Sequence, residues 1–159
     1  MTPLATHRKY CTFHVAGRFL GIEIERVQEV VRAQPFTEVP LAASAVRGLI
    51  NLRGQVVPAL ELRHCLGMEA RAADVLPMNV VVRVDDRAIS LLVDEVGDVL
   101  EVPETAFEHT PHTLEPGERE LFSGLYKLED RLLLILDTDR AVAAGFSGAG
   151  ADAAVKEIP

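Results

Sequence analysis

The segment GLINLRGQVVPALELR, from Gly48 to Arg63, contains two apolar runs separated by the pair Arg53-Gly54. Each run has the length of a β-strand, and a polar residue followed by glycine is typical of a two-residue hairpin turn. The central side chains of such a turn point into solvent, so Arg53 is expected to project from the tip of an apolar hairpin. A charged residue there can serve only to keep the turn soluble, or it can contact another molecule.

A second stretch, GLYKLEDRLLLILDTDR, has nearly the same layout, and it aligns Gly124 with Gly48, 76 positions earlier. The stretches FHVAGRFLGIEIERVQEVV and VRVDDRAISLLVDEVGDVL also align, at a spacing of 69 positions, which brings Val27 onto Val96. Because both matches occur in the same order along the chain, they indicate an internal duplication. The longer second spacing is explained by additional residues in the polar connection PETAFEHTPHTLEPGERE.

Apolar residues alternate within each half, as they do in β-strands. The pairs Ala16-Gly17 and Asp85-Asp86 interrupt this alternation at equivalent places and suit tight turns that need positive φ angles. The segment Val27–Val31 also fits one face of a helix, but it is short, and we favour a turn that runs into a strand.

Each half is expected to close with a hairpin and a short helical segment, the first ending at Gly67 and the second running from a cap at Thr138-Asp139 to Gly145. About five short strands in each half suggest a small β-barrel, and one such barrel would be marginally stable alone. The sequence therefore predicts an all-β fold in which two barrels pack together, with a groove at their junction as a natural binding site.

Composition limits the classes of function. The chain has 159 residues, which predicts one domain or two small lobes, and its net charge of −8 argues against a general binder of nucleic acid or anionic membranes. The longest apolar run, Leu132–Leu136, is far shorter than a membrane span, and the first residues do not resemble a signal peptide. Cys11 and Cys65 lack the spacing of metal ligands and are expected to be reduced, structural thiols.

Neither catalytic residues nor a metal or cofactor site is expected. His109 and His112 flank Pro111, which disfavours the helix that would bring them onto one face. Asp139 is explained as a helix cap. The stretch GFSGAG has no strand before it and no Lys-Ser or Lys-Thr pair after it, so it is not a phosphate-binding loop.

The segment VRGLINLRGQVVPALELR, with GIEIERVQEVV before it and SLLVDEVGDVL after it, resembles the CheW family of bacterial chemotaxis coupling proteins. The similarity runs from about Tyr10 to about Ala144, although Glu61 stands where an aspartate is common. The resemblance implies two SH3-like five-stranded barrels packed around a shared apolar core, with short helical segments. It divides the chain into an N-terminal arm (1–9), a CheW-like domain (10–144) and a flexible tail (145–159). Lobe one is expected over about 10–67 plus the closing C-terminal segment, and lobe two over about 78–138.

The resemblance also implies a cytoplasmic, non-catalytic adaptor that joins a CheA-type histidine kinase to the cytoplasmic tips of methyl-accepting chemoreceptors and is recruited to membrane-associated receptor arrays. No nucleic acid, direct membrane insertion, cofactor or metal is implied. In the family, the groove between the lobes takes the helical receptor hairpin. The matching positions here are the candidate binding residues Val27, Glu29, Gly48, Arg53, Val96 and Val99. The valines can equally belong to the core, and Gly48 can simply ease the start of a strand.

Two other functions remain open. The same fold could regulate a chemosensory pathway other than swimming, with surface motility or a second messenger as its output. A small β-barrel that binds a ligand or nucleic acid is the other alternative. The aromatic content of 5% and the absence of tryptophan argue against this last function, because such barrels use aromatic stacking platforms.

Overall fold

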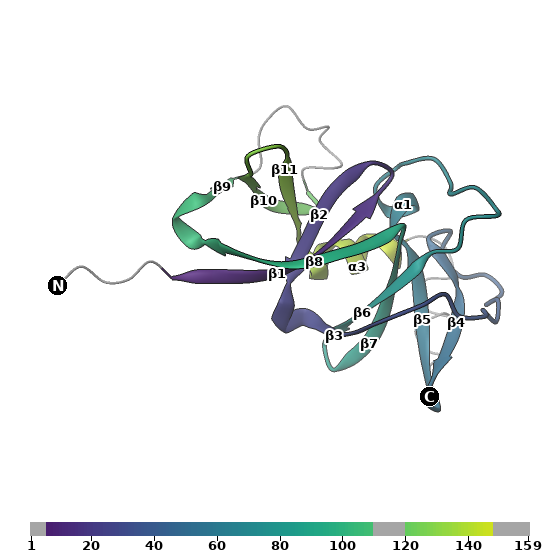
Figure 1. The fold of residues 1–159 in the computed structure, drawn as a ribbon. Coiled ribbons are helices and arrows are strands. Elements are labelled where there is room, and N and C mark those ends of the chain that lie inside the picture. The colour runs from purple at the N-terminus through teal and green to yellow at the C-terminus, as the bar shows by residue number, and fades with distance from the viewer. Residues whose placement is uncertain (1–5, 110–119, 148–159) are drawn as a thin grey trace.

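The computed structural model describes residues 6–109 and 120–147, and it consists mainly of β-strands in two sheets (Figure 1). The first sheet has the strand order β8-β1-β2-β11-β10-β9. Its strands are β1 (His7–Val15), β2 (Arg18–Glu23), β8 (Glu95–Pro103), β9 (Phe107–His109), β10 (Phe122–Lys127) and β11 (Leu132–Leu136). The second sheet has the order β3-β6-β7-β5-β4. Its strands are β3 (Val27–Val31), β4 (Val46–Leu52), β5 (Gln55–Glu61), β6 (Met78–Val84) and β7 (Arg87–Val93). The all-β class with two SH3-like units is confirmed.

The two sheets do not follow the two halves of the sequence. We call residues 7–65 the first half and residues 78–145 the second half. The β1–β2 hairpin of the first half pairs with β8 and β11 of the second half, and the β6–β7 hairpin of the second half pairs with β3 and β5 of the first. The sheets therefore do not coincide with the expected lobes, over about 10–67 plus the closing C-terminal segment and over about 78–138, because each sheet takes one hairpin from the opposite half.

The strand registers confirm the duplication. Phe13 of β1 pairs with Val96 of β8, and the equivalent residues Val82 and Val27 pair in the other sheet. The same holds for the parallel pairs that join the halves, Gly21 with Ile135 and Ser90 with Ala59. The antiparallel and the parallel pairs between the halves are each present twice. The residues in the two copies are related by the spacings of 69 and 76 positions seen in the sequence.

The buried apolar side chains of residues 6–109 and 120–147 form three clusters. The largest lies between the sheets and takes residues from both of them and from the short helices α1 (Leu62–Cys65) and α3 (Thr138–Gly145). It includes Phe13, Leu20, Leu62, Val82, Leu91 and Ala141. A second cluster, around Ile50 and Leu92, lies on the other face of the second sheet, and a third, around Tyr10 and Leu133, on the other face of the first. Several strands are therefore buried on both faces, and the shared core is present.

The tight turns have the positive φ angles that their residue pairs predict. Ala16, Arg53 and Asp85 have φ angles of 50°, 52° and 50°, and the residue after each also has a positive φ. The segment before Val27 is a 3-10 turn, η1 (Ile24–Arg26), that runs into β3 as predicted. A second such turn, η2 (Glu104–Ala106), joins β8 to β9.

The N-cap of α3 is Asp137, one residue before the predicted cap at Thr138-Asp139, whereas α1 begins at Leu62. The side chain of Asp137 accepts a hydrogen bond from the backbone N–H of Arg140, and Glu61 caps α1 in the same way through Arg63. Glu61 and Asp137 are equivalent in the duplication, so the cap is repeated too. Asp139, expected as the cap, forms an ion pair instead. His112, Pro111 and most of the predicted tail lie outside the described residues, and β1 begins at His7, inside the predicted arm.

Candidate protein-binding surface

Arg53 lies at the tip of the β4–β5 hairpin, and 76% of its side chain is exposed. The left-handed conformation of Arg53 and of Gly54 (φ 85°) makes the turn tight, and the N–H of Gly54 donates to Asn51 Oδ1 at 2.9 Å. The guanidinium of Arg53 forms an ion pair with the carboxylate of Glu29. This contact holds the projecting side chain toward β3.

Glu29 lies in β3, which is an edge strand of the second sheet and pairs there with β6. The register between β3 and β6 shifts between Val27 and Glu29, which is a β-bulge. Such a bulge changes the direction of the side chains that follow it. Only 17% of the Glu29 side chain is exposed, so its carboxylate is a shielded partner for an exposed arginine.

Gly48 is required by a close backbone approach within the chain. It has a φ of 155°, and a Cβ atom on it would lie 2.7 Å from the carbonyl oxygen of Thr37. Thr37 and Leu49 exchange two backbone hydrogen bonds, of 2.8 and 2.7 Å, which bring residues 36–37 against β4. The expectation that Gly48 allows two backbones to approach is met inside this protein, and a role in binding a partner remains a prediction.

The three candidate valines differ in burial. Val27 and Val96 are half-buried and pack against the shared core, at equivalent positions of β3 and β8. Val99 is 53% exposed and lies farther along β8, where it pairs with Cys11. A truncation of Val96 thus affects both packing and surface, whereas Val99 is available to a partner without rearrangement.

The structure brings Glu29 and Arg53 into direct contact and places Val96 and Val99 on one strand. The six candidate residues do not line either of two surface hollows. One, of about 370 Å³, has Tyr10, Phe107 and Tyr126 in its wall, and the other, of about 440 Å³, lies between α1 and α3 beside Cys65 and Gly145. The candidate residues lie instead on one turn and on three edge strands, β3, β4 and β8.

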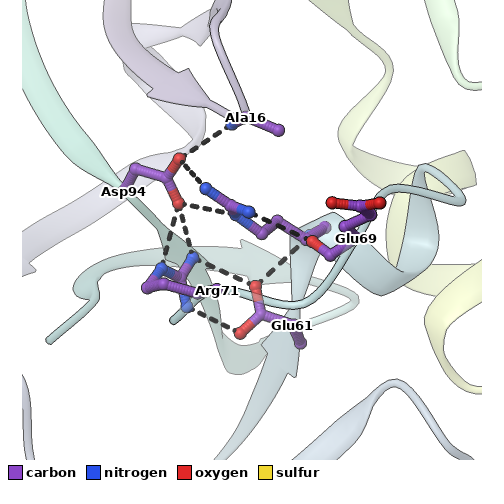
Figure 2. Close-up of polar contacts among 6 residues, drawn as sticks. Ala16, Glu61, Glu69, Arg71 and Asp94 are labelled. Atoms are coloured by element: carbon purple, nitrogen blue, oxygen red, sulfur yellow. Dashed lines mark hydrogen bonds and ion pairs between the residues drawn. The ribbon is translucent and has the colours of Figure 1, made fainter. Parts of the chain in front are cut away.

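An ion network that sequence reasoning missed lies where the two halves meet (Figure 2). Asp94, directly before β8, accepts hydrogen bonds from Arg63 at 3.0 and 2.7 Å and from Arg71 Nε at 3.0 Å. Arg71 also donates to Glu61 at 2.8 and 3.1 Å, and the backbone N–H of Ala16 donates to Asp94 at 2.8 Å. Two arginines and two carboxylates thus join the end of β5, the connection 66–77 and the start of β8.

The network sets the charge state of Asp94. Burial favours the neutral acid, but the hydrogen bonds from Arg63, the Ala16 N–H and Arg71 favour the anion more strongly and lower the pKa of Asp94 to about 2. Arg71 has only 7% of its side chain exposed, although most of its neighbours in the connection, residues 69–70 and 72–76, are exposed. Glu61, the unusual glutamate of the motif, carries both the helix cap and the contact with Arg71.

A second ion pair has a similar position in the other sheet, shifted by one residue at one end. Arg26, directly before β3, pairs with Asp139 on α3, and Asp139 is equivalent to Arg63 in the duplication. Each pair therefore connects the helix that ends one half to the residue before an edge strand of the other half. In both pairs the first half supplies the arginine and the second half the aspartate.

The described residues offer little for redox or metal chemistry. Burial raises the pKa of the Cys65 thiol to about 12, and the pKa of Cys11 is raised for the same reason, so both thiols are poor nucleophiles. Among the residues that the structure describes, no three His, Cys, Asp or Glu side chains are grouped as metal ligands would be. In the same part of the chain, no helix has the length and apolar character that crossing a membrane requires.

Comparison with known proteins agrees with the fold and the motifs. The family model for the CheW-like domain matches residues 9–145. The chain is 33% identical to the chemotaxis protein CheW of Rhizobium meliloti over 144 residues, which cover 87% of this chain and 93% of the relative. It is 28% identical to the chemotaxis protein CheW of Thermotoga maritima, over 82% of this chain and 85% of the relative.

A solved structure, that of the scaffolding protein CheW from Thermoanaerobacter tengcongensis, superposes with a TM-score of 0.75 at 26% identity. The superposition covers 83% of this chain and 90% of the solved chain. The matched region, residues 9–145, contains both halves of the duplication and the NLRG turn. The chain belongs to the CheW-like family and is a chemotaxis coupling adaptor.

Proposed function

We propose that this chain joins the cytoplasmic tip of a methyl-accepting chemoreceptor to a CheA-type histidine kinase and catalyses no reaction itself. It acts in the cytoplasm and is recruited there to membrane-associated receptor arrays. The relatives named chemotaxis proteins and the solved scaffolding protein support this role. The low reactivity of both thiols agrees with an adaptor.

The observation that carries the proposal is the ion pair between Arg53 and Glu29. A guanidinium has five N–H donors in a planar fork, and Glu29 engages the Nη2 nitrogen of Arg53. Most of the Arg53 side chain faces solvent, so the fork can also donate to a carboxylate or to helix carbonyls of a partner. A tight turn and a shielded carboxylate orient it in advance, which reduces the entropy lost on binding.

Apolar contacts would complete the surface. A receptor tip is an amphipathic helical hairpin, and such helices bind through apolar anchors with a few oriented polar contacts. Val99 offers exposed apolar surface, and the half-buried Val27 and Val96 offer the edges of the shared core. Gly48 supports the same region by holding β4 against residues 36–37.

Co-purification tests this role. The wild-type chain, Arg53→Glu and Arg87→Glu are each mixed with the CheA-type kinase and a soluble receptor-tip fragment of the same organism. Arg87 is a matched control, because it is an exposed arginine at the start of β7, next to a different hairpin turn. We expect Arg53→Glu to lose the ternary complex and Arg87→Glu to keep it. Wild-type chain that binds neither partner, or Arg53→Glu that binds both normally, would contradict the proposal.

A further inference from the structure

The strand pairs that build the sheets are of two kinds. Hairpin pairs lie within one half, whereas β1 with β8, β2 with β11, β3 with β6 and β5 with β7 all join the first half to the second. The shared core also takes apolar side chains from both halves. The two halves therefore recognise each other through four strand pairings and one large apolar contact.

Charge adds to this recognition. Arg63 and Arg26 of the first half pair with Asp94 and Asp139 of the second. The Arg63–Asp94 pair is partly shielded from water, with under a fifth of each side chain exposed. Because the first half carries both arginines and the second half both aspartates, these ion pairs can form between any first half and any second half, whether from one chain or from two.

One covalent connection, residues 66–77, joins the halves. Residues 72–76 are exposed, and Val75 and Leu76 are large apolar residues among them. The connection is held to the two halves by Arg71, through Glu61 of the first half and Asp94 of the second. Arg63 adds a hydrogen bond to the carbonyl oxygen of Glu69 at 3.1 Å.

We propose that the surface between the halves also fits a second copy of this chain, so that two copies exchange their second halves and form a closed dimer. Every strand pair between the halves, the shared core and both Arg–Asp pairs then re-form between chains. The connection is the part whose environment changes, and the exchange of an identical element between copies is a low-cost route to a dimer. Arg71 favours the monomer, because a single chain folded on itself lets it contact Glu61 and Asp94 together.

Disulfide trapping on full-length chains tests the exchange. Lys9 of β1 and Glu101 of β8 are exposed partners that belong to different halves, whereas Lys127 and Leu132 are exposed partners within one half. Chains carrying only Lys9→Cys and only Glu101→Cys are mixed, unfolded, refolded together at high concentration and oxidised. A 9–101 disulfide, identified by peptide mass spectrometry, forms between these chains above the level of collisional cross-linking only if they exchange halves.

We expect the 9–101 link in a covalent dimer, and an increase of severalfold when both chains also carry Arg71→Met. The matched mixture of Lys127→Cys and Leu132→Cys chains should give only the level of collisional cross-linking, because exchange keeps that pair within one chain. A single chain with both Lys9→Cys and Glu101→Cys must close the disulfide internally, which confirms the geometry. If the 9–101 mixture links no more than the 127–132 mixture, with and without Arg71→Met, the exchange does not occur.

Discussion

Glu29 and Arg53 are 24 positions apart in the sequence and form an ion pair between β3 and the β4–β5 turn. In the order β3-β6-β7-β5-β4, these elements belong to opposite edges of the second sheet. Their contact therefore requires the sheet to curl, as a small barrel does. The pair marks the place where the two edges approach each other and presents an arginine at that place.

Exchanging the two charges separates the stability of this pair from its role in binding. Glu29→Arg and Arg53→Glu each place like charges together, and each should lower the free energy of unfolding by about 1 kcal/mol or less, because the arginine is exposed. The double variant should recover most of that loss in urea denaturation. It should not recover kinase and receptor binding, since the turn then presents a carboxylate. Restored binding in the double variant would show that the pair acts only on stability.

Gly48→Ala should destabilise the chain by about 1–3 kcal/mol, because the new methyl group meets the Thr37 carbonyl and the φ angle is unfavourable. Gly54→Ala provides the comparison, since Gly54 also has a positive φ but has open space around it. It should cost about 1 kcal/mol. Thermal unfolding measures both. Equal losses for the two variants would mean that the approach of residues 36–37 contributes nothing.

The valines of β8 should respond differently to an aspartate. Val99→Asp should leave the free energy of unfolding within about 0.5 kcal/mol of the wild type, because the side chain is mostly exposed. Val96→Asp should cost several times more, since Val96 packs against the shared core. Receptor binding should fall in both. A folded Val99→Asp chain that binds normally would remove Val99 from the binding surface.

The ion network predicts a loss of stability in acid. The pKa of Asp94 is about 2 in the folded chain and about 3.9 in an unfolded one, so the carboxylate contributes stability above about pH 5. That contribution, about 2 kcal/mol, is lost as the pH falls from 5 through 2. Asp94→Asn should flatten the decline between these pH values, and Asp74→Asn, at an exposed site, should not. Urea denaturation at each pH, with an NMR titration of Asp94, measures the effect.

Much of the fold could be predicted from the sequence because the duplication is visible in it. Aligning Val27 with Val96 and Gly48 with Gly124 identified which strand positions are equivalent, and the turn pairs anticipated the positive φ angles. The exchange of hairpins could not be predicted in this way. Alignment shows which strands are equivalent, but β1 has the same apolar pattern whether it pairs with β3 or with β8.

The candidate surface was partly predictable for a similar reason. The NLRG segment identified Arg53 as a projecting residue, but no local pattern connects it to Glu29, because an ion pair across two edges depends on how the sheet curls. Arg71 lies in a connection whose sequence has no periodic pattern, so nothing in the sequence indicated that it belongs to the ion network. Arg63 and Glu61 belonged to the family motif, so the unusual glutamate was the one available hint of the network.

The pairing of each half's hairpin with strands of the other half also determines when this chain can fold during its synthesis. The ribosome releases β1 and β2 first, yet they complete their sheet only when β11, ending at Leu136, has emerged. The second sheet is complete earlier, once β7 has emerged at Val93. Over that interval the apolar side chains of the β1–β2 hairpin lack their final neighbours, so the nascent chain is most exposed to aggregation at its oldest segment.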